Sequence, residues 1–371
     1  MPEEKRSRIR RVARQICAGL LAILAAVSFL PLLETDAWWI RIFDFPRIQL
    51  AIGIALLAGL LAALAWPRGP GLAPVALAAA ALVYHLVQLY PYAPFAEERA
   101  AQVATCDEAR RLSVLVANVQ ESNEQGQEFL EMVERHPADL VLVLETDDWW
   151  DRHLSALDEA YPRHVGHVAE EDAAFGMHLY SRHPLVEPDF VYLFDAFTPS
   201  VSTGVRLPGG DEVRFLGLHP RPPQAWSQPT TSRDAHLLAA ALQAEAAESP
   251  AILAGDFNAV PWEETNRRAA RLGGLLDPRH GRGLFNTFKV GNPLIEWPLD
   301  QVLFQEELAL VSFEVLPGFG SDHRPVRAEL CLHPDAAAMQ TPPAPQEDDR
   351  AEARATIAAA EQMDMAAPAS E

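Results

Sequence analysis

The sequence predicts a soluble α/β domain preceded by three transmembrane helices. Three apolar stretches, residues 16–33, 48–66 and 72–90, contain no charged side chain, and each approaches the length of about 20 residues that crosses a bilayer. From residue 106 to about residue 333, strand-like apolar runs alternate with polar stretches of helical spacing. This alternation favours an α/β fold for the second part of the chain.

The distribution of basic residues predicts how the chain crosses the membrane. The first 15 residues carry six basic side chains, whereas the loop 34–47 carries two and the short connection after residue 66 carries one. This bias keeps the N-terminus in the cytoplasm, so three spans deliver the α/β domain to the periplasm or cell exterior. A lone first stretch is compatible with a signal peptide, but two further apolar stretches directly after it favour a domain in the cell (inner) membrane.

Composition predicts four parts of the chain. They are a basic cytoplasmic head (1–15), a membrane domain (16–95), the α/β domain (105–334) and an acidic tail rich in alanine and proline (335–371). The tail has almost no aromatic or branched residues, which predicts disorder. The net charge of −21 argues against a nucleic-acid partner without excluding one.

The strand-like runs of the α/β domain carry, at or just after their ends, polar residues that chemistry can use. In chain order these are Asn118, Glu145, His219, Asp256, Asn258, Asp300, Asp322 and His323. Taken singly, each has a structural reading, such as a turn residue at a strand end or a hydrogen-bonded histidine. Their succession along the domain favours one shared site.

The stretch "AILAGDFNAVPW", residues 251–262, shows the pattern most clearly. Its apolar run lies between Pro250 and Gly255 and reads as a buried strand. If the extended backbone continues past Gly255, Asp256 and Asn258 point to one face at the carboxyl end of the strand, where open α/β sheets bind ligands. The alternative is a strand end closed by a turn, which aspartate and asparagine favour.

These motifs resemble those of the endonuclease/exonuclease/phosphatase family of metal-dependent phosphoesterases. The resemblance covers the whole soluble part and is carried by "ANVQ", "LETD", "LYSRHPL", "GLHPRPP", "GDFNAVPW", "LDQVLF" and "SDHRPV". It implies a four-layer sandwich of two mixed β-sheets flanked by helices, like deoxyribonuclease I, with the active site at one edge. The apolar stretches lie outside it and are similar to those of a membrane-anchored bacterial subgroup.

The resemblance implies a role for each polar residue at the strand ends. Glu145, with Asn118 and Asp322, would hold Mg²⁺ or Mn²⁺, which prefer oxygen ligands. Asp256 would orient or deprotonate the attacking water, and Asn258 would donate to the phosphoryl oxygens.

The two histidines of these motifs would act on the phosphate itself. His323 would contact the phosphate or take a proton, with Asp300 holding its ring. His219 would donate to a non-bridging oxygen or act as general acid. Three arginines are candidates for a second phosphate group, with surface salt bridges as the alternative reading: Arg182, Arg221 and Arg233.

The resemblance also bears on two of the three cysteines. Cys106 precedes the first strand and Cys331 ends the last, and the family fold places those strands antiparallel and adjacent. In an oxidising compartment a disulfide between them would tie the two ends of the domain together. The alternative is a pair of free buried thiols.

Three functions compete at this point. The first and favoured one is a membrane-anchored, metal-dependent phosphoesterase that hydrolyses a phosphate ester or pyrophosphate on a lipid or small headgroup at the outer face of the membrane. The second is an extracytoplasmic nuclease, which the acidic domain disfavours. The third is a non-catalytic binding module, which the competent residue at every catalytic position disfavours.

Overall fold

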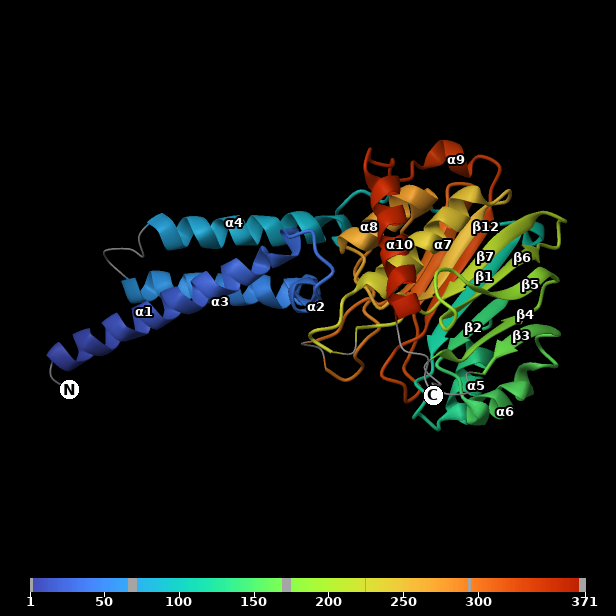
Figure 1. The fold of residues 1–371 in the computed structure, drawn as a ribbon, viewed down its shortest axis with the longest axis horizontal. Coiled ribbons are helices and arrows are strands. Elements are labelled where there is room, and N and C mark those ends of the chain that lie inside the picture. Colours follow the sequence, from blue (N-terminus) through green and yellow to red (C-terminus); the bar gives the residue numbers. More distant parts are fainter. Residues whose placement is uncertain (1–2, 66–71, 169–174, 224, 293–294, 367–371) are drawn as a thin grey trace. The chain divides into compact units, whose positions relative to one another are not determined.

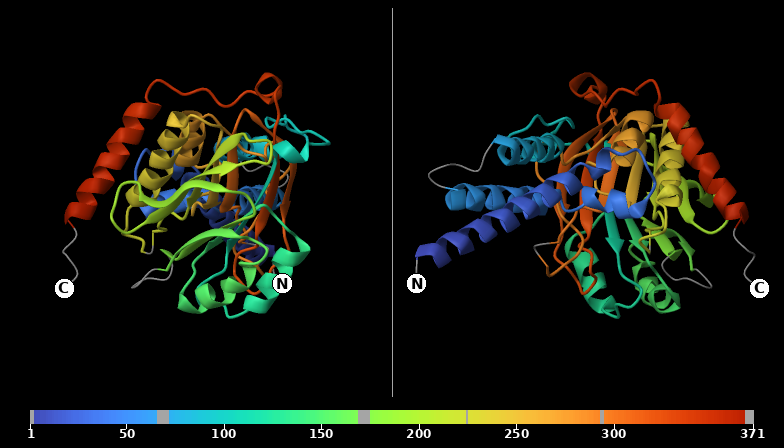
Figure 2. Two further views of the ribbon diagram at one scale, coloured as in Figure 1. Left: turned by 90° about the vertical axis from the view of Figure 1, so that its right-hand side faces the viewer. Right: turned by 60° about the vertical axis from the view of Figure 1, so that its left-hand side comes forward.

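The computed structural model describes residues 3–65, 72–168, 175–223, 225–292 and 295–366. The chain forms two compact units, one of residues 1–91 and 223–230 and the other of residues 92–222 and 231–371. Figures 1 and 2 show the helices of the first unit in blue and the strands of the second in green to red. Each unit has a hydrophobic core of its own.

Three apolar helices make up most of the first unit: α1 (Glu3–Ser28), α3 (Arg47–Ala65) and α4 (Leu72–Leu89). Each contains a segment long and apolar enough to cross a membrane. The helices pack through a core of small and aliphatic residues, while large apolar side chains such as Leu56 and Leu86 stay exposed on the outside of the bundle. An apolar outer surface suits a lipid environment, in agreement with the three spans that the sequence predicts.

Polar side chains join the three helices at one end of this bundle. His85 of α4 is hydrogen-bonded through Nε2 to Ser28 Oγ of α1 at 2.8 Å. Arg47, the first residue of α3, pairs with Asp44 and donates to the hydroxyl of Tyr84 at 3.1 Å. These contacts fix the register of the helices, because a buried polar group needs a partner at one defined height.

The loop between α1 and α3 pairs with a segment from far along the chain. This loop contains the short helix α2 (Trp38–Arg41). Ala37 forms a β-bridge with Pro229, and the backbone amide of Thr230 donates to Asp36 O at 2.7 Å. Residues 225–230 therefore belong to the unit of apolar helices.

Two six-stranded mixed sheets form the second unit. The first has the order β11-β12-β1-β2-β4-β3 and the second β5-β6-β7-β8-β10-β9. The strands of the first sheet are β1 (Arg111–Asn118), β2 (Leu140–Leu144), β3 (Arg163–His167), β4 (Met177–Ser181), β11 (Leu308–Val315) and β12 (Val326–Leu332). Those of the second are β5 (Leu185–Tyr192), β6 (Pro199–Arg206), β7 (Glu212–Leu218), β8 (Ala251–Asp256), β9 (Leu275–Leu276) and β10 (Asp300–Gln305).

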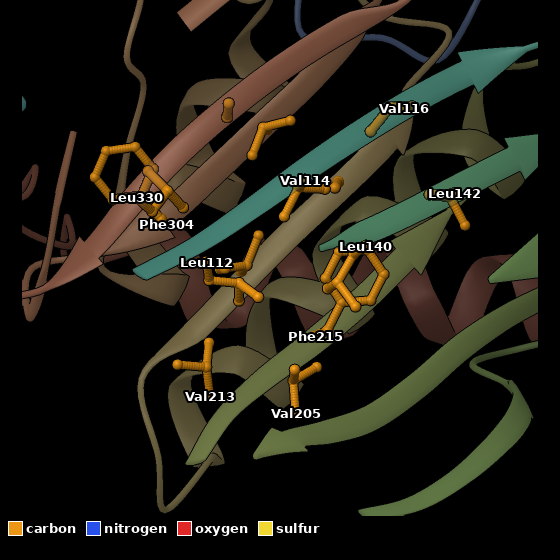
Figure 3. Packing of buried hydrophobic residues seen from close by; sticks show 14 of the residues in the cluster. Leu112, Val114, Val116, Leu140, Leu142, Val205, Val213, Phe215, Phe304 and Leu330 are labelled. Carbon is orange, nitrogen blue, oxygen red and sulfur yellow. The ribbon is translucent and has the colours of Figure 1, made fainter. Parts of the chain in front are cut away.

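The two sheets pack face to face and helices cover their outer faces. Figure 3 shows the core between the sheets, to which Val114, Leu142 and Phe215 contribute. Alternate residues of β1, such as Leu115, point outward and pack with α5 (Gly126–Arg135) and α6 (Asp148–Leu154). The second sheet carries α7 (Thr231–Ala246), next to which lies α8 (Glu264–Gly273). The four-layer sandwich is therefore confirmed.

A disulfide joins the two ends of this sandwich. β1 and β12 pair antiparallel, with Arg111 opposite Cys331, and Cys331 is bonded to Cys106. The remaining cysteine, Cys17, is a buried free thiol in the unit of apolar helices. The disulfide is therefore the correct one of the two alternatives that the sequence left open.

The prediction of a disordered tail from residue 335 is wrong for much of that tail. Residues 336–339 form α9 (Ala336–Met339), and residues 349–366 form the helix α10 (Asp349–Ala366). Arg271 of α8 holds the carboxylate of Asp349 with two hydrogen bonds, of 2.7 and 2.6 Å, and Ala353 packs against α7 and α8. Alanine-rich composition with few large apolar residues suits a helix that docks closely, since small side chains suffice there. Residues 367–371 of the predicted tail lie outside the described residues.

Candidate active site

The polar residues predicted from the strand ends come together from both sheets. Asn118 ends β1 and Glu145 follows β2, while His219 follows β7 and Asp256 ends β8. Both strand pairs, β1 with β2 and β7 with β8, are parallel, so their carboxyl ends lie at the same edge of their sheets. Antiparallel pairing of β8 and β10 sets Asp300 directly opposite Asp256. The topology therefore explains the gathering of residues that are far apart in the sequence.

Glu145, His219 and Asp256 form a group that could hold a metal ion. His219 Nε2 lies 3.7 Å from Glu145 Oε1 and 3.8 Å from Asp256 Oδ2. These distances are too long for direct hydrogen bonds, although the three atoms face one another. Two carboxylates and an imidazole fit a divalent cation, which would neutralise both acids at once.

Asn118 lies beside this group as a hydrogen-bond donor. Its Nδ2 donates to Glu145 Oε1 at 2.7 Å and to Asp256 Oδ2 at 3.2 Å. Its Oδ1 accepts from the backbone amide of Gln120 at 3.0 Å. In this arrangement Asn118 holds the two carboxylates in place, whereas the sequence predicts that its oxygen is a metal ligand.

Asp322, the third predicted ligand, contacts the site through its backbone. Its amide donates to Gln120 Oε1 at 3.2 Å, and its carbonyl accepts from the amide of Val290. Among the described residues, the two groups of side chains that could hold a metal do not include Asp322, and His219 takes a place in one of them instead. The ligand role of Asp322 stays a prediction.

A second group, Asp256, Asp300 and His323, shares Asp256 with the first. His323 Nδ1 is hydrogen-bonded to Asp300 Oδ2 at 2.8 Å, and its Nε2 lies 3.6 Å from Asp256 Oδ2. Burial lowers the pKa of His323, but the carboxylates of Asp300 and Asp256 outweigh it and raise the pKa to about 10. Burial raises the pKa of Asp300, against the pull of His323. The two carboxylates therefore favour the cationic form of His323, in which both ring nitrogens carry a proton.

The backbone at the site adopts left-handed torsions at three residues that are not glycine. The φ angles are +59° at Gln120, +60° at Glu145 and +50° at Asn258. Non-glycine residues in this region cost about 1–3 kcal/mol each and gather at functional sites. Their neighbours compensate in part, since the amide of Asn258 donates to Asp256 Oδ1 at 2.9 Å.

The structure corrects the extended geometry predicted for residues 256–258. β8 ends at Asp256, and Asn258 lies in a left-handed turn rather than in a continued strand. The Nδ2 of Asn258 donates to Pro220 O at 3.0 Å, which ties it to the loop after β7. The turn-forming alternative is therefore correct, because the side chain of Asp256 accepts the amide of Asn258 and closes the turn.

Close backbone approach requires glycine beside two of these residues. Gly255 has a φ of +150°, and a Cβ there would lie 1.8 Å from Leu218 O. This contact draws the ends of β7 and β8 together and so places His219 next to Asp256. A Cβ on Gly176 would lie 1.6 Å from the carbonyl oxygen of Thr146, the residue after Glu145.

Several supporting residues were not predicted from the sequence. Ser321 Oγ donates to Asn118 O at 2.7 Å and accepts from the amide of His323 at 3.0 Å, so it links the two groups. Thr146 Oγ1 is hydrogen-bonded to His178 Nδ1 at 2.9 Å, which steadies the chain next to Glu145. The serine of "SDHRPV" stood in a quoted motif and could have been found there; His178 on β4 carries no such signal.

Known proteins share this fold. The model of the Endonuclease/Exonuclease/phosphatase family matches residues 115–323. Truncated TDP2 of Caenorhabditis elegans is 14% identical with a TM-score of 0.50, over 60% of this chain and 98% of its own. An endonuclease/exonuclease/phosphatase of Beutenbergia cavernae is 18% identical with a TM-score of 0.48, over 60% and 72%.

The catalytic domain of human nocturnin, solved with a bound sulfate anion, is 17% identical with a TM-score of 0.49, over 61% of this chain and 96% of its own. No curated protein sequence gave a significant match. At these identities the structural likeness concerns the fold.

Proposed function

This chain belongs to the Endonuclease/Exonuclease/phosphatase family, and on that premise we propose that it is a membrane-anchored, metal-dependent phosphoesterase acting on a phosphorylated lipid or small headgroup. Members of the family are phosphoester hydrolases. The proposal rests on the position of Asp256. Its carboxylate belongs to both groups of potential metal ligands and lies near both histidines.

Asp256, His323 and Asp300 have different roles in the hydrolysis of a phosphoester. A water oxygen attacks phosphorus, the bond from phosphorus to the leaving oxygen breaks, and the leaving oxygen gains a proton. Asp256 accepts the amide of Asn258 through Oδ1 and Asn118 Nδ2 through Oδ2, and its carboxylate, fixed in this way, would orient the attacking water and take its proton. Cationic His323 donates to the phosphoryl group, and Asp300 fixes its ring.

Asn258 and His219 supply further donors. The amide of Asn258 has two N–H groups, of which one donates to Pro220 O and the other remains for a phosphoryl oxygen. His219 lies on the opposite side of Asp256 from β10, at the end of β7. We assign it to a non-bridging oxygen or to metal binding.

Glu145, His219 and Asp256 would hold the cation, with Asp322 as a further ligand. Bound Mg²⁺ or Mn²⁺ would neutralise charge on the phosphoryl oxygens in the transition state. Asn118 would keep both carboxylates turned toward the ion through its two hydrogen bonds.

The membrane helices support a lipid substrate. A domain anchored beside a bilayer meets lipid phosphates at a high effective concentration, whereas dissolved nucleic acid gains nothing from the anchor. The strongly acidic chain also repels a polyanion. By the positive-inside bias the domain would lie outside the cytoplasm.

A hydrolysis screen of the full-length protein in detergent tests the proposal. The substrates are farnesyl diphosphate, phosphatidic acid and supercoiled plasmid, each with Mg²⁺, with Mn²⁺ and with EDTA. We expect metal-dependent release of phosphate from a lipid and little nicking of the plasmid. Efficient nicking beside inert lipid phosphates would favour the nuclease, and inactivity of the wild type equal to that of His323→Ala would favour a binding module.

A further inference from the structure

Arg221 lies two residues after His219 and carries a charge that no acid of the described residues neutralises through an ion pair. Its guanidinium carbon lies 4.7 Å from the centre of the Phe175 ring. Its Nε is buried and has no hydrogen-bond partner. A buried donor without a partner is destabilising, so a ligand that accepts from this guanidinium would stabilise the arrangement.

The position of Arg221 is fixed by its neighbours. Pro220 and Pro222 restrict the backbone on either side, and Pro220 O accepts from Asn258 Nδ2 at 3.0 Å. Phe175 is itself buried, and its ring centre lies 6.5 Å from that of His219. The same ring therefore approaches a residue of the metal-capable group and the guanidinium of Arg221.

Carboxylates are abundant at this site, yet Arg221 is held on an aromatic ring instead of on one of them. A guanidinium stacked on a ring keeps its N–H groups directed outward in one plane, a geometry that matches phosphate oxygens. Such a preorganised cation loses little conformational entropy when an anion binds. Among the described residues, the site's acids Glu145 and Asp256 already engage Asn118 and His219, so an anion of the substrate would suit the guanidinium.

The other two candidate arginines are committed elsewhere. Arg233 is buried, donates to Asp234 and Glu263, and supports the turn by donating to Asn258 O at 3.0 Å. Arg182 stacks on Tyr161 at 5.0 Å, and its amide donates to Asp139 at the start of β2, the opposite end of that strand from Glu145.

We propose that Arg221, stacked on Phe175, forms a subsite for a second phosphoryl group next to the scissile one, so that the enzyme selects diphosphates over monophosphates. This inference rests on the proposed phosphoesterase activity and narrows its substrate class. In hydrolysis of a diphosphate, water adds to the terminal phosphorus, the bond to the bridging oxygen breaks, and the bridging oxygen leaves with a proton as part of the monophosphate. Arg221 stabilises the negative charge on the phosphoryl group that leaves.

The test compares substrates that differ by one phosphoryl group. Full-length wild type, Arg221→Gln and Arg221→Lys are assayed on farnesyl diphosphate and farnesyl phosphate. Charge-assisted hydrogen bonds contribute about 1.5–3 kcal/mol, so Arg221→Gln should lose about 10- to 150-fold in kcat/KM on the diphosphate. On the monophosphate, kcat/KM of Arg221→Gln should change by less than about 3-fold. Arg221→Lys should recover part of the loss on the diphosphate, because lysine keeps the charge without the planar donors.

Arg182→Gln is the matched control, because it removes the same side chain from a similar ring stack away from the site. Arg182→Gln should leave the ratio of kcat/KM on the diphosphate to kcat/KM on the monophosphate unchanged. ADP distinguishes the source of the diphosphate: a matching loss with ADP assigns the subsite to free diphosphates as well, and a loss confined to farnesyl diphosphate assigns it to lipids.

Two outcomes would overturn the inference. One is an equal loss on both farnesyl substrates, which would make Arg221 a structural residue, and the other is a wild type that prefers the monophosphate. Neither outcome would contradict the proposed phosphoesterase activity, since the wild type is active in each. A wild type inactive on every phosphoester would instead refute the proposed function itself.

Discussion

Replacing Asp300 by asparagine tests how the site sets the charge of His323. The two side chains are buried and joined by a hydrogen bond of 2.8 Å. Unit charges about 4 Å apart interact by about 4 kcal/mol at an effective dielectric constant of about 20. Because about 1.36 kcal/mol corresponds to one pKa unit, removing the charge of Asp300 should lower the pKa of His323 from about 10 to about 7.

The sign of the pH effect follows from the role of the imidazolium as a donor. In the wild type the cation persists below this pKa, and the activity that depends on it is lost as the pH rises through about 10. In Asp300→Asn the same loss should occur as the pH rises through about 7. The measurement is kcat/KM on one phosphoester substrate from about pH 6 to about pH 10.5.

A buried acid outside the site provides the control. Asp277 accepts hydrogen bonds of 2.7 and 2.9 Å from Arg279, and both residues are buried. Asp277→Asn should lower the melting temperature and leave the alkaline limb of the rate profile where it is. An unmoved alkaline limb in Asp300→Asn, or an equal shift in both variants, would refute the assignment of the limb to His323.

Four further outcomes are expected. Glu145→Gln should lose at least about 10³-fold in rate and bind Mg²⁺ more weakly; near wild-type rate with unchanged metal dependence would contradict the ligand role. The disulfide closes a separation of 225 residues, so Cys106→Ser with Cys331→Ser should cost about 2–5 kcal/mol in chemical unfolding. Burial raises the pKa of Asp349, but hydrogen bonds from its arginine partners outweigh this effect and lower the pKa to about 2. Hydrogen exchange should therefore show α10 loosening as the pH falls below about 4 toward 2. In Asp349→Asn the same loosening should be seen already at neutral pH. Reporter fusions after residue 100 should be active only outside the cytoplasm, and a cytoplasmic signal there would refute the orientation.

The sequence predicted the fold and the gathering of the strand-end residues because both depend on local patterns. Strand-like apolar runs alternate with helical spacing, and the apolar stretches near the N-terminus have the length of membrane spans. The candidate site residues stand at or just after the ends of these runs, so the parallel pairs β1 with β2 and β7 with β8 bring those of each pair to one edge. A residue at a strand end is positioned by the sheet, and this made Glu145, His219 and Asp256 predictable as neighbours.

Features that depend on distant parts of the chain could not be predicted in this way. Helix α10 has few large apolar residues, and its docking depends on Arg271, which lies 78 positions before Asp349. The three candidate arginines look alike in the sequence, yet Arg221 stacks on Phe175 beside the site while Arg233 pairs with two acids. Their different roles come from tertiary contacts that no local pattern records.

The left-handed residues of the site show why its fine geometry needed the structure. Glu145 is a poor residue for a positive φ on intrinsic grounds, whereas Asn258 tolerates one, so propensity alone does not separate a turn from extended backbone at these strand ends. The turn at Asn258 holds because Asp256 Oδ1 accepts its amide, Pro220 O accepts its side chain and Arg233 donates to its carbonyl. Three separate elements thus fix one left-handed torsion, and Asp256 turns its second oxygen toward both histidines. Relaxing this turn with Arg233→Met should therefore lower kcat and raise KM together, because the water-orienting oxygen of Asp256 and the phosphate-binding amide of Asn258 both depend on it, and it should lower the melting temperature because Asp234 and Glu263 lose their buried partner.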